Sequence, residues 1–572
     1  MTILYAQRLR RIFLAALAVV LLFSGLSCGD HGDEPYHPPV GEGPWILVDL
    51  YHTRIQNPED YRLTKGNYAY QGVFGFHRLF EHLRVHDYKW TSIREMPLSK
   101  PRLSGFDVLF INLVHEGRPD FSSDEIVAIQ EFVYNGGGLF IIADHTNVYR
   151  HAERVNPIIA PMGLEILFHT AVDFPPQFSV GGNGWIMMFD FAEHAVTAGV
   201  DMISFQTGGA MHAWENPAIV IDGAPLAQGG EGVAFTSDRS FADLWNEEET
   251  SGFYGDWLWN ADATAEPKGP LNGVVTGRYG AGRIAIAGDQ NMFGDAWLHF
   301  GNNFELALNI FEWTAQQETT GDLRLRDTKP VGLDIGLDAS RNSYNTGRVA
   351  ADGYYTFFVH ANRDTDVTAR ATTRLENHHD ALILLSPTSD YSPAEIAIIG
   401  GYLESGRRVV ITFEAESIHA STAKLVEALA PDFSVSARGE SATITQGAAA
   451  FHALDIERIN APLTLQSQKL MVSDIELATA TGSRDQPPTN RYLLDVTSSW
   501  GEPLLTASSG TVSVDIARSK LVGQGELIIF LQDGFFRNRT MGYKETEAPR
   551  AHSTASVKLQ YKFLDYLKKP SE

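Results

Sequence analysis

The stretch FDVLFINL at positions 106–113 decides the fold of this chain, because it reads as a buried strand. A helix is predicted to begin at SSDE, positions 122–125, whose spacing is typical of a capping box, and to end at three glycines, 136–138. A second apolar strand, LFIIA at 139–143, follows directly. This alternation of strand and helix predicts an α/β fold with a mostly parallel sheet flanked by helices.

The same order returns later in the chain in a weaker copy. The matched pairs are 107–113 with 380–386, 121–126 with 391–396, 139–142 with 409–412, and 280–286 with 523–529. We therefore predict two tandem α/β domains, residues 45–317 and 331–569. A charged stretch, residues 318–330, is expected to link them.

The N-terminus resembles the leader of a bacterial lipoprotein. Arg8, Arg10 and Arg11 precede an uncharged run, 12–26, and Cys28, the only cysteine in the chain, follows small residues. The run is shorter than the ~20 apolar residues that cross a bilayer. We predict a signal peptide over residues 1–27, a lipid anchor at Cys28 and a flexible tether over 28–44; an ordinary secretory signal is the alternative.

Composition and net charge limit the classes of partner that the chain is expected to bind. Apolar residues make up 44% of it and aromatic residues 11%, as in globular proteins. The formal net charge is −25, so the chain is expected to bind no nucleic acid and to attach to a membrane only through its lipid. The expected location is the bacterial cell envelope, at the outer membrane or facing the periplasm, with an envelope protein or glycan as partner.

The two strands, the triple glycine, residues 193–200 and residues 280–303 together resemble the class I glutamine amidotransferase-like superfamily. Within it they resemble a branch related to gliding-motility and intraflagellar-transport-type domains. The resemblance implies two flavodoxin-like domains, the second degenerate. It also implies a nucleophilic cysteine after the strand that ends at Ala143, but this chain has DHTN there, and EAES at 414–417 in the second copy. Cysteine-dependent glutamine hydrolysis is therefore excluded.

Polar residues gather at the predicted carboxyl ends of the strands of the first domain, where open parallel sheets bind ligands. The candidates are Asp49, His52, His115, Asp144, His145, Asn147 and Asp289. Such side chains could ligate a divalent metal or exchange protons with a substrate; alternatively, they cap helices and complete hydrogen-bond networks. No cofactor is predicted, and a divalent metal is the alternative. The second copy offers Glu414, Glu416 and Asp533 but no imidazole opposite His145, so any site is expected in the first domain.

A second candidate is an aromatic stretch interleaved with acids. It contains Trp245, Tyr254, Trp257 and Trp259. Aromatic faces beside carboxylates suit carbohydrate binding, whereas aromatic insertions also pack back onto their own domain.

Two functions follow from these features. The first is a lipid-anchored envelope protein that acts as a non-catalytic binding or scaffolding module. The alternative is a metal- or carboxylate-dependent hydrolase that acts on an envelope glycan or a related polar substrate.

Overall fold

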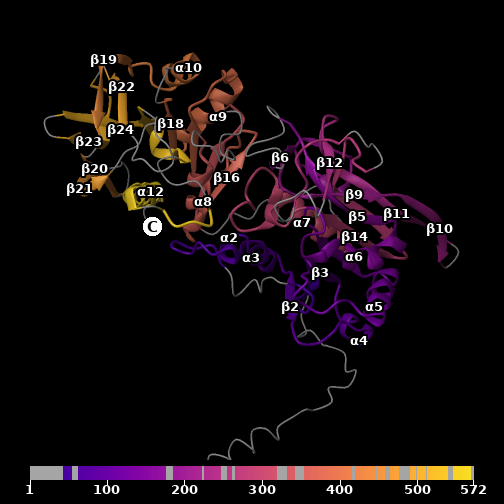
Figure 1. Ribbon diagram of the computed structural model, residues 1–572. Coiled ribbons are helices and arrows are strands. Elements are labelled where there is room, and N and C mark those ends of the chain that lie inside the picture. Colours follow the sequence, from indigo (N-terminus) through magenta and orange to yellow (C-terminus); the bar gives the residue numbers. More distant parts are fainter. Residues whose placement is uncertain are drawn as a thin grey trace, which may run out of the picture.

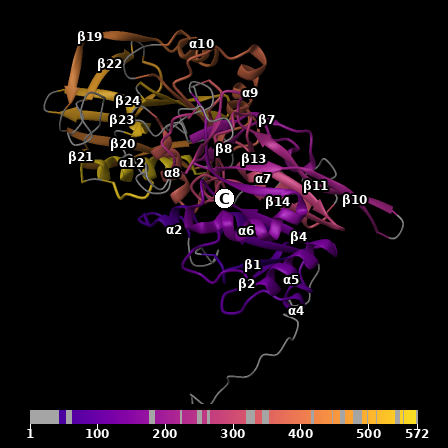
Figure 2. The same cartoon turned by 45° about the vertical axis from the view of Figure 1, so that its right-hand side comes forward.

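The structure is a computed structural model (Figures 1 and 2). It describes residues 43–568 except for 54–61, 175–184, 222–223, 246–253, 261–264, 318–331, 342–352, 415–418, 445–446, 458–463, 476–489, 497–498, 510–511, 532, 539–544 and 550. The predicted signal peptide, Cys28, nearly all of the tether and the linker 318–330 lie outside the described residues. We call residues 43–317 the first half and residues 332–568 the second half.

The predicted strands of the first half form the parallel part of a mixed sheet. Its five parallel strands stand in the order β2 (Lys89–Ile93), β1 (Trp45–Asp49), β3 (Val108–Asn112), β4 (Gly138–Ile142) and β14 (Gly282–Ala287). Every residue of β3 and β4 is buried, which explains their unbroken apolar sequence.

The sheet continues beyond β14 with antiparallel strands that the sequence did not predict, so it is mixed. They are β13 (Asn272–Tyr279), β9 (Gly209–Ala213), β5 (Leu164–Val172) and β12 (Phe241–Leu244), with β7 (Asp190–Phe191), β10 (Glu215–Ile221) and β11 (Ala224–Phe235) branching from them. A separate pair is formed by β6 (Trp185–Met188) and β8 (Ile203–Gln206). The β10–β11 hairpin projects from the body in both views (Figures 1 and 2).

Helices cover both faces of the first sheet. On one face, α3 (His77–Val85) and α7 (Asn303–Thr314) pack on a core that includes Phe110 and Phe140. On the other face, α5 (Ser123–Tyr134) and α6 (His151–Ile159) pack on a core that includes Leu109 and Ile141. Short helices α2 (Tyr70–Val73) and α4 (Lys100–Leu103) complete this half. Alternate residues of one strand therefore serve opposite cores.

The second sheet repeats the order of the parallel strands of the first. Its parallel strands stand in the order β16 (Val367–Thr372), β15 (Leu333–Asp338), β17 (Ala381–Leu385), β18 (Arg408–Thr412) and β25 (Gly525–Phe530). Antiparallel β24 (Val512–Val522), β23 (Glu502–Ser509), β20 (Gly447–Glu457) and β21 (Thr464–Ile475) follow. A separate pair joins β19 (Val435–Ile444) to β22 (Asn490–Val496).

The helices repeat as well. In the second half α8 (Tyr355–Arg363) and α12 (Ala551–Leu567) cover one face, and α9 (Pro393–Glu404) and α10 (Ala420–Leu429) cover the other. The predicted capping box at Ser122 and Glu125 is present at the start of α5, and Ser392 and Glu395 form the same box at α9. The chain is thus α/β, with mixed sheets flanked by helices and a repeated order of elements.

The two halves share one apolar core. It joins Val73, Phe74 and Trp297 of the first half to α8 and α12 of the second. The ring of Trp297 stacks on Tyr355 with centroids 4.9 Å apart, and its Nε1 donates to the Tyr355 hydroxyl at 3.2 Å. A backbone bridge also joins Phe300 to Ala371 at the free edge of β16. The halves therefore contact each other through packed side chains and backbone.

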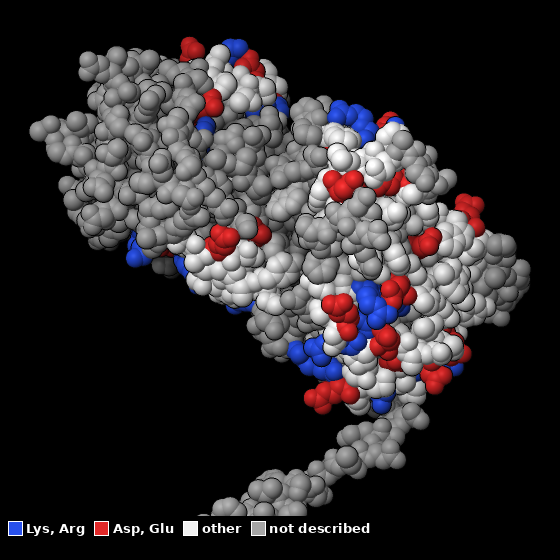
Figure 3. Space-filling model, in the orientation of Figure 1, with Lys and Arg blue, Asp and Glu red and all other residues white. Residues whose placement is uncertain are grey.

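Two surface features bear on the predicted setting. No helix among the described residues is both long and apolar enough to cross a membrane. The described part of one face of the first half carries acidic and basic side chains interspersed (Figure 3).

We expect Trp297→Ala to lower the free energy of unfolding by about 3–5 kcal/mol, because it empties a fully buried site in the shared core. Denaturant unfolding followed by circular dichroism measures this loss. Trp214→Ala is the matched control; Trp214 is 40% exposed, so its loss should cost less than about 0.5 kcal/mol. Equal effects of the two changes would show that the shared core does not stabilise the protein.

Candidate functional site

The described contacts divide the candidate residues of the first half into two groups. Asp144, His145 and Asp289 lie together beyond the ends of β4 and β14, which are neighbours in the sheet. Asp49 and His52 pair with each other beyond the end of β1. The structure therefore brings together only part of the predicted set.

Asp144 and Asp289 form a buried carboxyl pair. Their exposed fractions are 5% and 0%, and their charges lie close enough to interact. Burial, and then the charge of Asp289, raise the pKa of Asp144 well above its usual range. Burial raises the pKa of Asp289 to about 7, although backbone N–H groups at Gln206 and Asn291 donate to it at 2.6 and 2.7 Å. Burial therefore favours the protonated form of both carboxyls.

No Lys or Arg forms an ion pair with either carboxyl within the described parts of the chain. Asp144 Oδ1 instead accepts a hydrogen bond from the backbone N–H of His145 at 2.7 Å. The Asp144 N–H donates to Nε2 of buried His151 at 3.2 Å, so this imidazole is an acceptor there. A carboxyl pair that is neutralised by protons can donate to a ligand as well as accept from it.

Tyrosines surround the carboxyl pair. Burial raises the pKa of Tyr70 and of Tyr254, and the charge of Asp144 raises both further, which places both phenols near that carboxyl. Tyr149 also contributes to both shifts. The Tyr70 hydroxyl donates to Asn291 Oδ1 at 3.0 Å, and 37% of the residue is exposed. Phenol groups thus lie between the carboxyl pair and solvent.

The backbone beyond the strand ends is strained at several non-glycine residues. Leu113, Thr146, Tyr149 and Thr207 have φ of 36°, 50°, 56° and 57°. L-residues rarely adopt this left-handed region, and such residues concentrate at functional sites. Thr146 is the third residue of DHTN, the segment that follows β4. The strain supports a functional role for this edge of the sheet.

The four candidate aromatic residues have different surroundings. The ring of Tyr254 stacks on His145 with centroids 4.3 Å apart, and Trp257 lies 5.4 Å from Tyr254. These two residues therefore extend the carboxyl site. Trp259 is 39% exposed, but the Lys268 ammonium covers one face of its ring at 3.8 Å. Trp245 is half-buried, and its backbone N–H donates to the Phe168 carbonyl.

His52 has a structural environment. Its Nδ1 lies 2.8 Å from Asp49 Oδ2, and its Nε2 lies 3.2 Å from Glu125 Oε1, with both side chains of the Asp49 pair fully buried. Burial alone would lower the pKa of His52, but the hydrogen bonds and charges of Asp49 and Glu125 outweigh it and raise the pKa to about 9. The imidazole is therefore a cation that ties the end of β1 to the start of α5.

The second half repeats this tie with an arginine. Arg341 follows Asp338 at the end of β15 by three residues, as His52 follows Asp49, and it pairs with Glu395 of the α9 capping box. Arg341 also lies over the ring of Tyr391 at 5.2 Å, where His52 stacks on Phe121 at 3.8 Å. An arginine in the equivalent place indicates that the position needs a positive charge, and these contacts fit the alternative in which Asp49 and His52 complete a hydrogen-bond network.

His115 and Asn147 lie at the margin of the carboxyl site. His115 Nδ1 accepts from the Gly117 N–H at 3.0 Å, and its ring lies 4.4 Å from that of Tyr149. Asn147 exchanges hydrogen bonds with Glu153 near the start of α6, at 3.1 and 3.3 Å. The helix-capping alternative therefore describes Asn147.

The equivalent edge of the second half has a cation between its acids. Arg537 lies 2.8 Å from Asp533 and 3.5 Å from Glu414, which stands where Asp144 stands in the first half. Gly294 occupies the position of Arg537 in the first half, counted from the ends of β14 and β25. A Cβ there would lie 2.8 Å from the backbone of Phe74, so no side chain fits. Glu416 lies outside the described residues.

One group of described side chains has the spacing of a metal site, and it lies in the second half: Asp334, His378 and His379. The sequence placed any metal near Asp144 and His145 instead. Among the described residues, that expectation has no support.

Sequence reasoning missed Tyr70, Tyr149 and Gly294. Tyr70 lies more than 70 residues before its neighbour Asp144, and nothing in its local pattern marks it. Gly294 could have been found by aligning the two copies past their last parallel strands, where the glycine faces an arginine.

Comparisons with known proteins give a fold likeness only. No family model matches the chain, and no curated protein matches it. Among solved structures, the mmIFT52 N-terminal domain is 14% identical with a TM-score of 0.33 and covers 48% of this chain and 99% of that one. A ThuA-like protein from Bacteroides uniformis is 14% identical with a TM-score of 0.28, covering 51% and 99%. A cytoplasmic protein from Salmonella typhimurium is 14% identical with a TM-score of 0.27, covering 47% and 98%.

We expect His52→Gln to lower the free energy of unfolding by about 3–5 kcal/mol, because it leaves Asp49 and Glu125 buried without their cation. Folding raises the pKa of His52 from 6.5 to about 9, so the folded state binds its proton more tightly. This contribution is fully present below pH 6.5 and is lost as the pH rises through about 9.

Urea unfolding of wild type and His52→Gln at pH 6 and pH 10 measures this dependence. His212→Gln is the control, because the His212 side chain is 56% exposed and its nearest carboxylate is 3.6 Å away. A difference between wild type and His52→Gln that stays constant with pH would refute a charged His52.

Proposed function

We propose that this protein is a lipid-anchored envelope protein whose first half binds a hydroxylated ligand, an envelope glycan, as a non-catalytic module. The two repeated halves would be amidotransferase-like domains without the nucleophile. The observation that carries the proposal is the buried Asp144 and Asp289 pair, which no described cation neutralises and which tyrosines surround.

The chemistry of the pair suits a sugar hydroxyl. A protonated Asp144 donates a hydrogen bond and an ionised Asp289 accepts one, and a hydroxyl does both. The stacked His145 and Tyr254, with Trp257 beyond them, add aromatic surface for the C–H face of a sugar ring. At the corresponding edge of the second half Arg537 pairs with Glu414 and Asp533, so binding is assigned to the first half.

Envelope location is proposed from the leader. Cys28 follows a short uncharged run that three arginines precede, and the net charge of −25 gives the chain no attraction to anionic lipid. Attachment then depends on lipid at Cys28.

A second candidate is a carboxylate-dependent hydrolase for the same ligand. It is favoured by the raised pKa of both acids, because a protonated carboxyl can serve as general acid while its ionised neighbour serves as general base. In this alternative Asp144 protonates the leaving oxygen and Asp289 activates water.

We expect Asp144→Asn to weaken binding to an oligosaccharide array by at least about tenfold, because the O–H donor of the protonated carboxyl is lost. The same change should stabilise the protein by about 0.5–2 kcal/mol at pH 8, since it removes a carboxyl whose ionised form is disfavoured by burial. At pH 4 the wild-type carboxyl is protonated, so the difference in stability should shrink.

Glu414→Gln is the matched control, because Glu414 stands at the equivalent strand end beside Arg537 and should not affect glycan binding. Equal loss from both changes, or no binding by wild type, would contradict the proposal. Release of reducing ends by wild type but not by Asp144→Asn would favour the hydrolase.

We expect Cys28→Ala to move the protein from the membrane fraction to the soluble fraction, because no acyl chain can then be attached. Fractionation of cells that express each form measures this. Unchanged fractionation of the variant would contradict a lipid anchor.

A further inference from the structure

The crossover between β16 and β17 carries two histidines to the start of β15. There, one ligand atom from each of Asp334, His378 and His379 lies within 4.8 Å of the other two. Asp334 and His379 are buried, each with a side chain 1% exposed, whereas the His378 side chain is 51% exposed. Gly336 makes room for His379, since a Cβ there would come within 2.5 Å of the ring.

The ring of buried His379 faces Asp334, but its hydrogen bonding is incomplete. Its Nδ1 lies 3.2 Å from Asp334 Oδ1, yet neither ring nitrogen makes a well-formed hydrogen bond with any residue that the structure describes. A buried polar atom without a partner is unfavourable and calls for a ligand that satisfies it. His379 Nδ1 and Asp334 Oδ1 both carry lone pairs and lie close together, as two ligands of one cation do.

The distances match those between ligands of one metal ion. Ligand atoms at about 2.0–2.1 Å from a tetrahedral Zn²⁺ lie about 3.3 Å from one another. His379 Nδ1 and Asp334 Oδ1 are 3.2 Å apart, and His378 Nδ1 and the neighbouring Glu376 Oε2 are also 3.2 Å apart. Two imidazoles with one or two carboxylates form a donor set that Zn²⁺ and Co²⁺ accept.

Arg370 would not bind such an ion directly but would hydrogen-bond to its ligand Asp334. Its Nε donates to Asp334 Oδ1 at 3.2 Å, which leaves the other oxygen lone pairs of this carboxylate available. Hydrogen-bond donors of this kind orient carboxylate ligands.

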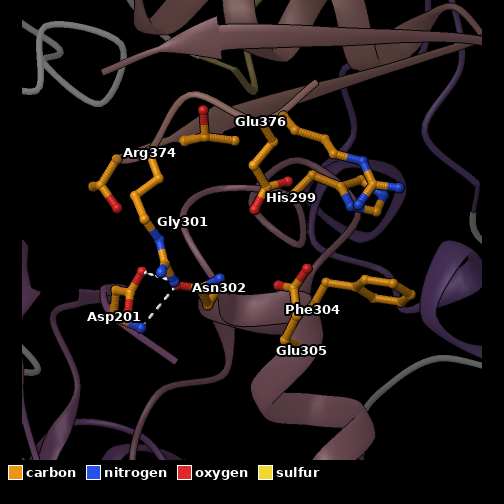
Figure 4. A pocket seen from close by; sticks show the side chains of 11 residues that line it. Asp201, His299, Gly301, Asn302, Phe304, Glu305, Arg374 and Glu376 are labelled. Atoms are coloured by element: carbon orange, nitrogen blue, oxygen red, sulfur yellow. Dashed lines mark hydrogen bonds and ion pairs between the residues drawn. The ribbon is translucent and has the colours of Figure 1, made fainter. Parts of the chain in front are cut away.

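The group adjoins the contact between the halves. Glu376 points into a small polar cavity that it shares with His299 and Glu305 of the first half, and nearby Arg374 forms an ion pair with Asp201 (Figure 4). An ion held by His378 and His379 would fix the crossover that carries Arg374 and Glu376. We propose that Asp334, His378 and His379 form a Zn²⁺-class metal site, with Glu376 beside it, that holds this crossover against the first half.

The test uses the full chain, stripped with chelator, dialysed and titrated with CoCl₂. We expect one Co²⁺ per chain, detected by its visible ligand-field absorption, and displacement of Co²⁺ by ZnCl₂. His378→Ala should weaken Co²⁺ binding more than tenfold. It is the deciding variant because His378 is half-exposed, whereas loss of the buried His379 can also impair folding.

His212→Ala is the control. His212 and Glu165 form a histidine–carboxylate pair of similar exposure, 56% and 48% against 51% and 45% for His378 and Glu376, with no further ligand in the group of described side chains. His212→Ala should leave Co²⁺ binding unchanged. Absence of Co²⁺ absorption in wild type, or equal loss in the two variants, would overturn the proposal.

Discussion

A carboxylate buried at the end of a parallel strand has to be neutralised, and this requirement governs the structure of both halves. Burial in a medium of low polarity disfavours the charged form strongly, so each such group needs a cation, donated hydrogen bonds or a proton. Asp49 and Glu125 have His52 between them, and Asp533 and Glu414 have Arg537. Asp144 and Asp289 have no Lys or Arg partner among the described residues, and burial raises the pKa of both, which favours their protonated forms.

The duplicated order of elements makes this difference informative. Asp295 accepts from the backbone N–H of Arg78 at 2.8 Å, and Asn538 accepts from that of Thr356 at 2.8 Å, so the two edges are built on the same frame. Within that frame one half has Arg537 and the other has Gly294 with the Phe74 backbone against it. Since the frame is the same and the side chains at the strand ends differ, the buried carboxyl pair of the first half is a local feature and not a consequence of the fold.

The sequence predicted the parallel part of each sheet because fully buried strands leave an unbroken apolar signal. Residues 106–113 and 139–143 match β3 and β4 to within two residues at each end, and the matched segments of the second copy agree as closely with β17 and β18. The antiparallel extension escaped because strands such as β5 and β9 mix exposed with buried positions and read as irregular chain. The convergence of Asp144 with Asp289 followed from strand ends alone, since β4 and β14 are neighbours. The structural role of His52 could not be predicted from strand ends, because its partner Glu125 is 73 residues away and forms part of a helix cap.

Because the halves share a core, the second half supports the site of the first half. Sequence comparison treats them as tandem units, yet Trp297 of the first half packs on Tyr355 of the second, and Arg78 of α3 donates to the side-chain oxygen of Asn362 at 3.2 Å. Arg78 is itself buried, so its charge is held by carbonyl and amide oxygens of the other half. A small separation of the halves would remove these oxygen partners from the guanidinium. Water could not replace them, because it would have to enter a packed core, so the separation is unfavourable. The second half therefore acts as a rigid support for α3 and, through the hydrogen bond from Arg78 N–H to Asp295, for the loop that follows Asp289. A half that has filled its own acidic edge with an arginine can in this way still contribute to the site of its neighbour.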